Sequence, residues 1–227
     1  MKKLFFMFAF VVLYVNAFSE VTNITAQAVD SVGPDGIPAL IDVIRSTDPA
    51  DDEIRIKALR RLGELNAKEW LNALLEELET VRVLPGGREV RNWRIRIMAA
   101  KALAATGDEK ASIYLALMLR RETDTTVKRA AAQALGLLGE TARKREVLEI
   151  MHSELEGARD NGLVSDLCEA LGKIGDKASF VYLLRVTSGP YLNYVKEVAQ
   201  KGITSTKWDK PSVFEELEKG RVTRYNK

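Results

Sequence analysis

The chain has 227 residues, of which 46% are hydrophobic and 29% charged, with 34 Lys and Arg against 32 Asp and Glu. That content can bury a core, while a net charge of only +2 argues against nucleic-acid binding, which depends on neutralising phosphates. A single cysteine, Cys168, and a single histidine, His152, exclude an intrachain disulfide and a zinc site built from Cys and His alone.

The N-terminus has the pattern of a secretory signal peptide. Lys2 and Lys3 precede an unbroken apolar run over residues 4–15, shorter than the roughly 20 residues that a membrane-spanning helix needs. Small residues allow cleavage after Ala17 or Ser19, and an uncleaved anchor helix is the alternative. We therefore expect residues 1–19 to be removed and the mature protein to be periplasmic or secreted. Loss of Lys2 and Lys3 would leave 32 basic and 32 acidic residues.

Residues 20–34 form a lead-in segment without strong periodicity, and a recurring segment follows. From residue 37 onward Ala, Leu, Arg, Lys and Glu dominate, which favours helix. Copies of the segment end at residues 63, 107, 139, 175 and 207, so the intervals are 44, 32, 36 and 32 residues, the period of one helical hairpin. A small residue lies five positions before each end and is followed by Leu or Ile. These small residues, which allow neighbouring helices to approach closely, are Ala58, Ala102, Ala134, Ala170 and Gly202.

Each copy ends with a helix-stop signal. Four glycines are expected to take the left-handed conformation after a helix: Gly63, Gly107, Gly139 and Gly175. Asn66 with Glu69 resembles a capping box for the next helix, and Asp108, Thr141 and Asp176 are expected N-caps.

The sequence Val-Lys-Arg-Ala-Ala-Ala-Gln-Ala-Leu-Gly-Leu-Leu-Gly at residues 127–139 resembles a HEAT repeat of the short bacterial kind. The resemblance covers about residues 35–208. It implies an all-α fold, a right-handed α-solenoid of about five HEAT-like helical hairpins. The first copy has Asp51 and Asp52 where Val-Arg is expected, and the last ends in Lys207 instead of Gly, as is typical of capping repeats.

Two segments interrupt or follow the repeats. Residues 81–91 are an insertion in which valines flank Pro85-Gly86-Gly87, so they form either a small β-hairpin or a longer loop. Insertions in solenoids lie on one face and often serve binding. Residues 209–227 form a tail in which Ser212 and Glu215 mark the start of a short helix, with Phe214 and Leu217 expected to cover the end of the last repeat.

The sequence shows no pattern typical of a catalytic, cofactor or metal site. No Ser lies in a Gly-x-Ser-x-Gly context, and no phosphate-binding glycine loop is present. We expect Cys168 to be a small buried residue and His152 to lie at a helix surface.

Basic and aromatic residues are the candidates for partner binding. The basic residues form a possible strip along the inner helices that faces an acidic partner: Arg94, Arg96, Lys101, Lys128 and Arg129. The alternative, which we favour for Arg96 and Lys128 because they share one repeat position, is a structural ladder of bonds along the stack. Typical interface anchors at helix ends are Trp93, Tyr191 and Tyr194, although aromatics there also pack within repeats.

The resemblance and the physical pattern together predict an exported scaffold or adaptor that binds another protein through its concave helical surface, and not an enzyme. Neither a cofactor nor nucleic acid is expected as a ligand. The alternatives are a non-metal lyase- or isomerase-like enzyme acting on a bound group, since some proteins of similar repeat pattern are of that kind, and a structural component of an envelope complex.

Overall fold

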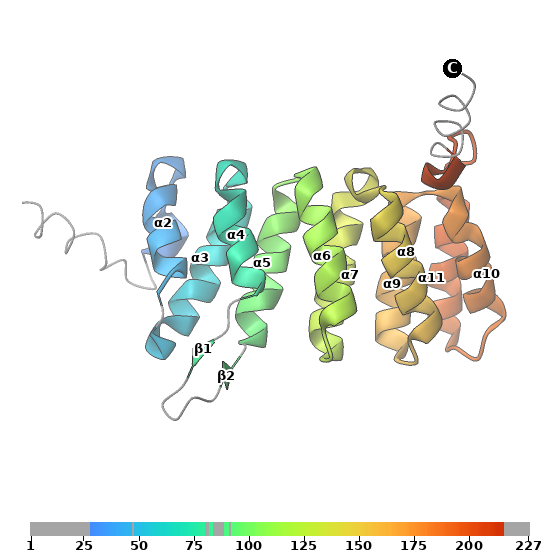
Figure 1. Ribbon diagram of the computed structural model, residues 1–227, viewed down its shortest axis with the longest axis horizontal. Helices are drawn as coiled ribbons and strands as arrows, with labels where there is room; N and C mark the ends of the chain where they lie inside the picture. The colour runs from blue at the N-terminus through green and yellow to red at the C-terminus, as the bar shows by residue number, and fades with distance from the viewer. Residues whose placement is uncertain (1–27, 47, 80–81, 84–88, 91, 216–227) are drawn as a thin grey trace, which may run out of the picture.

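The structure is a computed structural model that describes residues 28–46, 48–79, 82–83, 89–90 and 92–215, so the expected signal peptide lies outside it. The described chain is a row of five helical hairpins (Figure 1). Their helices are α2 (Ile37–Ile44) and α3 (Asp52–Glu64), α4 (Leu71–Leu78) and α5 (Trp93–Ala105), α6 (Glu109–Arg121) and α7 (Thr125–Leu138), α8 (Arg145–Gly157) and α9 (Asn161–Ile174), and α10 (Phe180–Ser188) and α11 (Asn193–Thr204). The prediction of an all-α solenoid of about five hairpins is confirmed.

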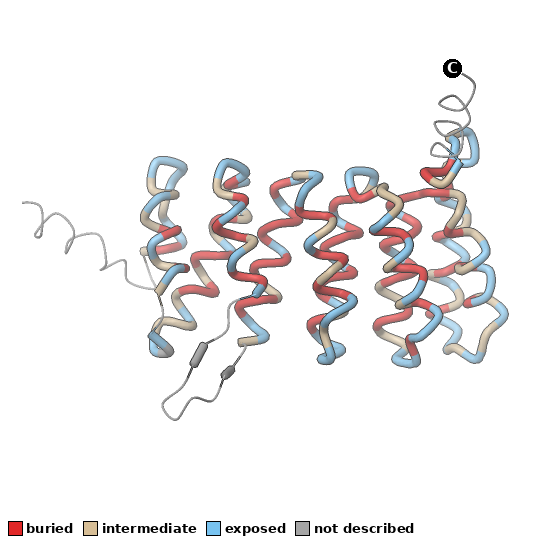
Figure 2. The backbone as a smooth tube through the Cα atoms, in the orientation of Figure 1, coloured by how far each residue is buried: buried red, intermediate tan, exposed pale blue. Residues whose placement is uncertain are grey.

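The helices form two layers. We call the first helix of each hairpin A-type and the second B-type. The A-type helices face the reader in Figure 1, and the buried residues in Figure 2 concentrate where the two layers meet. Short 3-10 turns join or precede several helices: Val29–Ser31, Pro34–Gly36, Pro49–Asp51, Lys68–Trp70, Gly139–Ala142 and Lys177–Ser179. Among the described residues, no helix is both long and apolar enough to cross a membrane.

The first copy of the repeat lies one helical turn from where the sequence placed it. Gly63 is inside α3, and the left-handed residue that follows this helix is Asn66, with a φ of 51°. Asn66 N and Ala67 N donate to the carbonyls of Gly63 and Leu62, a Schellman-type ending. The expected capping box at Asn66 is therefore wrong, whereas Gly107, Gly139 and Gly175 have the positive φ that was predicted.

Aspartates and one asparagine begin most of the longer helices. The predicted caps Asp108 and Asp176 accept hydrogen bonds from Lys110 N and Ala178 N, but Thr141 lies within a 3-10 turn and caps nothing. Three further residues cap helices with their side chains and were not predicted to do so: Asn92, Asp124 and Asp160.

Small residues bring the backbones of successive B-type helices together. A methyl group on Gly63 would lie 3.1 Å from the Cα of Ala102, and one on Gly136 would lie 3.1 Å from the Cα of Ala170. At the last contact, between α9 and α11, a methyl group on Gly172 would lie 2.6 Å from the Cα of Gly202. The B-type layer is therefore the tightly packed layer of the stack.

Both ends of the B-type layer replace small residues with polar ones, because no further hairpin packs there within the described chain. In α3, Arg61 stands five residues before Asn66, where later helices have Ala or Gly, and its Nε donates to the Val32 carbonyl at 2.9 Å. In α11, Gln200 and Thr204 occupy the positions of buried small residues in α9. Polar residues at both ends are typical of capping repeats. The departure expected at Asp51 and Asp52 is wrong, because the shift to Asn66 places Ile54 and Arg55 at the Val-Arg positions of the first copy.

The insertion forms a two-stranded β-hairpin, which was one of the two alternatives. β1 (Arg82–Val83) and β2 (Glu89–Val90) are antiparallel, with Arg82 opposite Val90 and Val83 opposite Glu89. In Figure 1 the hairpin projects beyond the ends of α4 and α5, at the edge where each A-type helix turns into its B-type partner.

The segment 207–215, which we call the C-terminal clasp, folds back over the turns after α7 and α9. Lys207 and Lys210 both pair with Glu140, and these hydrogen bonds lower the pKa of that carboxyl to about 2. Asp176, 2% exposed, accepts hydrogen bonds from Ser212 Oγ at 2.7 Å and Val213 N at 3.0 Å. The clasp thus ties the segment that follows α11 to the third and fourth hairpins.

Phe214 was predicted to cover the end of the last repeat, and this prediction is wrong. The Phe214 ring lies 5.7 Å from the Arg145 guanidinium and 6.5 Å from the His152 ring, both on α8. The start of a helix just after Ser212 agrees with the prediction, and Leu217 lies outside the described residues.

Candidate functional site

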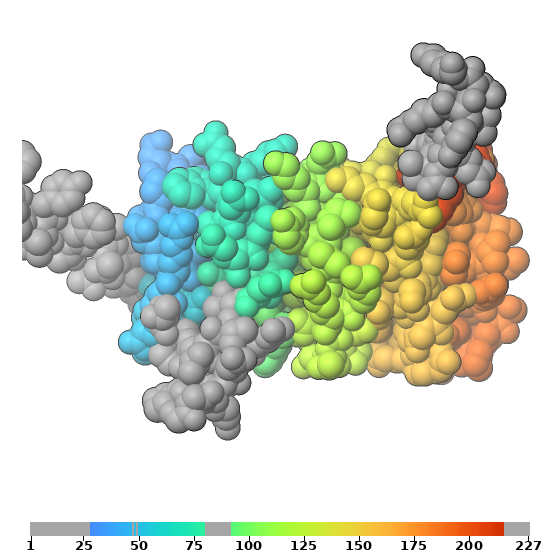
Figure 3. All heavy atoms as spheres, viewed as in Figure 1, coloured from blue at the N-terminus to red at the C-terminus, as the bar shows by residue number. Residues whose placement is uncertain are grey.

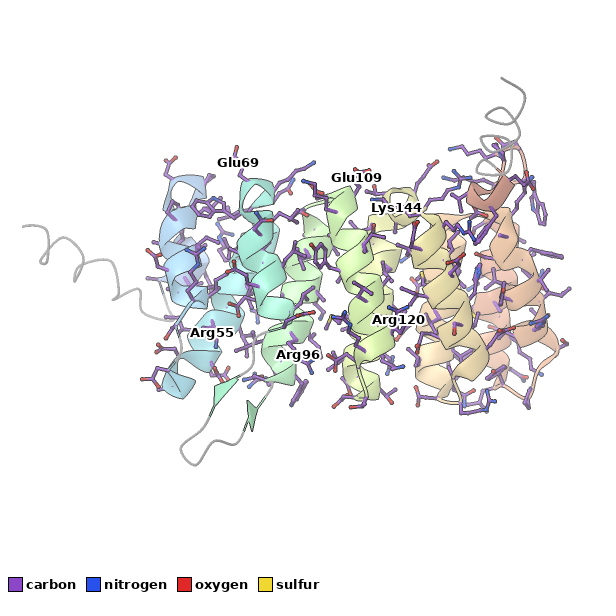
Figure 4. The ribbon with its side chains drawn as sticks, in the orientation of Figure 1. Arg55, Glu69, Arg96, Glu109, Arg120 and Lys144 are labelled. Carbon is purple, nitrogen blue, oxygen red and sulfur yellow. The ribbon has the colours of Figure 1, made fainter. Side chains whose placement is uncertain are left out.

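Three ion pairs, two almost fully buried and one partly buried, join B-type helices to the A-type helix of the next hairpin or to the residue just after it. Arg55 Nη2 lies 2.7 Å from Glu77 Oε2, and both residues are almost fully buried. Arg96 pairs with Glu122, and Lys128 pairs with Glu154. Figure 4 shows Arg55 and Arg96 on α3 and α5. We call these three pairs the ladder.

The ladder position lies eleven residues before each left-handed residue. Once Asn66 replaces Gly63 as the end of the first copy, Arg55, Arg96 and Lys128 become equivalent. The series stops at α9, where this position is the buried Val164. The geometry therefore supports the structural ladder for Arg96 and Lys128, and partner binding by these two residues stays a prediction.

The other predicted basic residues lie on the exposed surface of the B-type layer. Arg94 pairs with Glu53, and Arg129 Nε lies 2.7 Å from Asp166 Oδ2, a hydrogen bond that raises the pKa of Arg129. Lys101 is exposed, and no ion pair joins it to another residue that the structure describes. Acids alternate with bases on this surface, so it is not a purely basic strip.

The three predicted aromatic anchors are not brought together. Trp93 and Tyr194 are 49% and 48% exposed, but they belong to α5 and α11, three hairpins apart. Tyr191 is half-buried, with its hydroxyl 3.5 Å from the Ala158 carbonyl oxygen, and packs within its own end of the stack.

A groove of about 530 Å³ lies between the A-type helices α4 and α6. It opens on the face turned to the reader in Figure 3, between the teal and lime segments. Sequence reasoning did not find it. Ten residues line it: Asn72, Leu75, Glu76, Leu78, Glu79, Tyr114, Leu117, Met118, Arg121 and Glu122.

The groove has an apolar interior and a charged rim. Leu75 and Leu117 are partly exposed within it, and the Tyr114 side chain is 48% exposed beside them. At one end, Arg121 Nη1 lies 3.0 Å from Glu79 Oε1 across the gap, with both side chains mostly exposed. A volume in this range is typical of sites that hold a small molecule or the side chains of a bound segment.

A second, smaller hollow of about 250 Å³ lies between the A-type helices α8 and α10. It has the same construction: Tyr182 lines it, and Arg185 pairs with Glu156 across it. Between these two hollows, α6 and α8 are joined by a hydrogen bond of 3.0 Å from Lys144 Nζ to the Glu109 carbonyl, two residues labelled in Figure 4.

His152 is buried, so the expectation that it lies at a helix surface is wrong. Only 4% of it is exposed, its ring stacks on Tyr182 at 3.9 Å, and its Nε2 lies 2.9 Å from Ser179 Oγ. It follows Met151 and lies four residues after Leu148, so the apolar stripe of α8 already contained the signal. Burial lowers the pKa of His152 to about 4. Ser179 is 1% exposed, so this Ser–His contact is closed to substrates.

We expect the stability of the protein to fall on mild acidification because of His152. Its folded-state pKa of about 4 is below the ordinary 6.5, so the unfolded chain binds the extra proton first. The contribution is complete above pH 6.5 and is lost progressively toward pH 4, with roughly 2 kcal/mol lost between pH 7 and pH 5. Urea unfolding at both pH values measures this loss.

A His152→Phe variant, which keeps a ring against Tyr182, is the control for this prediction. Its free energy of unfolding should change by roughly 2 kcal/mol less than that of the wild type between the same two pH values. Equal changes in the two proteins would show that other groups, such as the carboxyl of Asp176, cause the acid sensitivity.

The remaining chemical groups are structural. Cys168 is fully buried against α11, as expected, and burial raises the pKa of its thiol to about 12. Burial would by itself raise the pKa of Asp176, but hydrogen bonds from Ala178 N, Val213 N and Ser212, with the nearby Arg143, lower it. Within the described ranges, no group of three or more His, Cys, Asp or Glu residues is placed to hold a metal ion.

The fold and its ladder define the chain as an α-solenoid of helical hairpins. A family model described as HEAT repeats matches residues 37–136, from the start of α2 to near the end of α7. No curated protein matches the chain.

Among solved structures, the chain is similar to one in the complex of CpcE and CpcF of phycocyanin lyase from Nostoc sp. PCC7120. The TM-score is 0.60 and the sequence identity 24%, over 80% of this chain and 68% of that chain. At this identity the likeness shows a shared fold.

The prediction that the protein is not an enzyme is contradicted by this similarity, because the same repeat architecture occurs in a lyase complex. The prediction rested on the lack of a catalytic pattern along the sequence. A solenoid assembles its surfaces from residues of different hairpins, as Glu79 and Arg121 of the groove illustrate. Such a surface leaves no local pattern, so we withdraw the prediction.

Proposed function

We propose that this protein binds a partner protein and acts, as a lyase-type subunit, on a group that the partner carries. The observation that supports the proposal is the similarity of the solenoid, over 80% of its length, to a chain of the complex of CpcE and CpcF of phycocyanin lyase. Stacked hairpins suit this task because they present long surfaces to another protein.

The groove between α4 and α6 has the chemistry that such a role requires. Its apolar interior takes up an apolar group or segment, and the Tyr114 hydroxyl can donate or accept a hydrogen bond beside it. At its rim, Glu79 can accept a proton or a hydrogen bond, while Arg121 can hold a carboxylate.

An exported scaffold is the second candidate, and the signal-like N-terminus supports it. In this candidate the partner lies on the exposed B-type surface. Arg94, Lys101 and Arg129 would then contact its acidic residues. A structural role in an envelope complex is the other alternative, and stable co-fractionation of the protein with that complex would distinguish it from a scaffold.

A cross-linking pulldown of the tagged protein from its own cells, read by mass spectrometry, tests the proposal. We expect it to recover one specific partner protein. Incubation of the partner that carries its group with the purified protein should lower the partner's intact mass by the mass of that group, because a lyase breaks the bond, and the released group should appear in solution. A partner of unchanged mass would contradict the lyase-type proposal and leave the scaffold, and the absence of any specific partner would contradict both.

Two charge-reversal variants show whether the B-type surface holds the partner. The triple variant Arg94→Glu/Lys101→Glu/Arg129→Glu changes three exposed residues and leaves the ladder intact. Arg185→Glu, at a side chain 64% exposed on α10, is the matched control. If the scaffold candidate holds, the triple variant loses the partner at least roughly tenfold while the control retains it, as expected for removed charge complementarity.

A further inference from the structure

We infer that the solenoid bends at the junction between its second and third hairpins, which we call the hinge. Two blocks, one from α2 to α5 and the other from α6 to α11, move relative to each other there. In Figure 1 the hinge lies between α4 and α5 on one side and α6 and α7 on the other. The inference goes beyond the proposed function, because it concerns the unbound chain and holds whatever the partner is.

The B-type layer lacks a glycine at the hinge. At the other three contacts between successive B-type helices, a glycine three residues before the left-handed residue meets a small residue of the next helix: Gly63, Gly136 and Gly172. In α5 the equivalent residue is Ala104, which is buried and carries a methyl group that those glycines lack. The backbones of α5 and α7 accordingly run less closely together than those of the other successive B-type pairs.

The A-type layer is open at the same junction, because the groove lies between α4 and α6. One junction further on, the backbones of α6 and α8 run close together. The Glu79–Arg121 pair across the groove has side chains that are 72% and 61% exposed. Beyond the N-terminal ends of the two helices, Lys68 Nζ lies 3.8 Å from Asp108 Oδ2, with the Lys68 side chain 59% exposed. Exposed ion pairs contribute little and are screened by salt, so these two hold the groove closed only weakly.

Buried contacts hold the neighbouring junctions. Arg55 joins the first two hairpins, since it donates to the Ile44 carbonyl and pairs with Glu77. Between the last two hairpins, His152 of α8 stacks on Tyr182 of α10 at 3.9 Å, and the clasp adds its bonds to the third and fourth hairpins. Each block is therefore fixed internally, while both layers are loosely packed between the blocks.

The second rung of the ladder is the pivot of the hinge. Arg96 of α5 pairs with Glu122, just after α6, and their side chains are only 5% and 10% exposed. A buried pair is costly to break, so the blocks rotate about this pair and do not separate. Repeats contact only their neighbours, so the rotation leaves the contacts inside each block intact. It changes the width of the groove and the angle between the B-type surfaces of the two blocks.

Electron paramagnetic resonance distances between pairs of nitroxide labels measure the bending in the intact protein. The labelled positions are exposed, and each is the second residue of its A-type helix: Asn72, Lys110 and Glu146. Asn72→Cys/Lys110→Cys spans the hinge, and Lys110→Cys/Glu146→Cys, within one block, is the matched control. The native Cys168 is buried and closed to the label. We expect the distance distribution across the hinge to be at least roughly twice as wide as that of the control, and equal widths would overturn the inference.

Two further variants test the ion pair that spans the groove. Arg121→Gln removes its pair with Glu79, whereas Arg185→Gln removes a similarly exposed pair, with Glu156, between α8 and α10. Arg121→Gln should widen the distance distribution across the hinge, as should about 1 M salt, and Arg185→Gln should leave it unchanged.

A distribution that neither Arg121→Gln nor salt changes, or one that Arg185→Gln widens equally, would overturn the inference. Far-ultraviolet circular dichroism confirms that the variants are folded. Neither measurement involves a partner, so the proposed function can fail while the hinge stands, and the reverse.

Discussion

Replacing Arg55 with Met is expected to lower the free energy of unfolding by about 3–5 kcal/mol, the usual cost of removing one partner from a buried ion pair. The Arg55 and Glu77 side chains are only 3% and 6% exposed, and Arg55 Nε also donates to the Ile44 carbonyl at 2.8 Å. The variant therefore loses the first rung of the ladder and one link between the first two hairpins. Urea unfolding followed by circular dichroism measures the change.

Two further variants separate burial from charge. In Arg55→Met/Glu77→Met both charges are gone, so most of the loss should be recovered. In Arg94→Met the broken pair, with Glu53, has side chains that are 48% and 68% exposed, and the cost should stay below about 1 kcal/mol. A double variant as unstable as Arg55→Met would show that the shape of the arginine, and not its charge pair, supports this contact.

Gly172→Ala is expected to destabilise the protein by about 1–3 kcal/mol, the usual cost of overpacking a core. Helix propensity alone predicts the opposite sign, since Ala in a helix is favoured over Gly by about 0.5–1 kcal/mol. The close approach decides, because the new methyl group would lie 2.6 Å from the Cα of Gly202. Gly172 and Gly202 both lie inside helices, where the backbone cannot shift locally, so α9 and α11 must move apart.

Gly157→Ala is the matched control, because this glycine ends α8 and nothing lies within 4 Å of an added methyl group. We expect its thermal unfolding midpoint to stay the same or rise slightly. A Gly172→Ala protein as stable as this control would show that the two helices separate at little cost. The small residues of the repeat would then not determine the spacing of the B-type layer.

The periodic part of the fold could be predicted from the sequence, because each hairpin repeats the same local contacts. Ala102, Ala170 and Gly202 were found by their spacing alone, and each meets a glycine of the preceding B-type helix. The error in the first copy has a local cause. Gly63 follows a Leu just as Gly139 does, and only the backbone shows that Asn66 takes the left-handed conformation one turn later.

The groove could not be predicted in the same way. Its lining comes from α4 and α6, which belong to different hairpins, so its shape depends on how whole helices pack and not on a local pattern. Tyr114 lies between the apolar residues Ile113 and Leu115, and in sequence it does not stand out as part of a site. His152 shows the converse case. Its position in the apolar stripe of α8 indicated that it is buried, and we expected it at the surface only because histidine is polar.

The C-terminal clasp changes how this solenoid is expected to unfold. In a row of repeats that touch only their neighbours, the last hairpin can fray while the others stay folded. Here the ladder stops at Val164, and the clasp instead connects the fifth hairpin to Glu140, Arg143 and Asp176 in the turns before α8 and α10. These contacts bridge the fourth hairpin, so we expect the last two hairpins and the turn after α7 to unfold together. The side of the stack that carries α11 is thus held in place, and we expect unfolding to begin at the first hairpin instead.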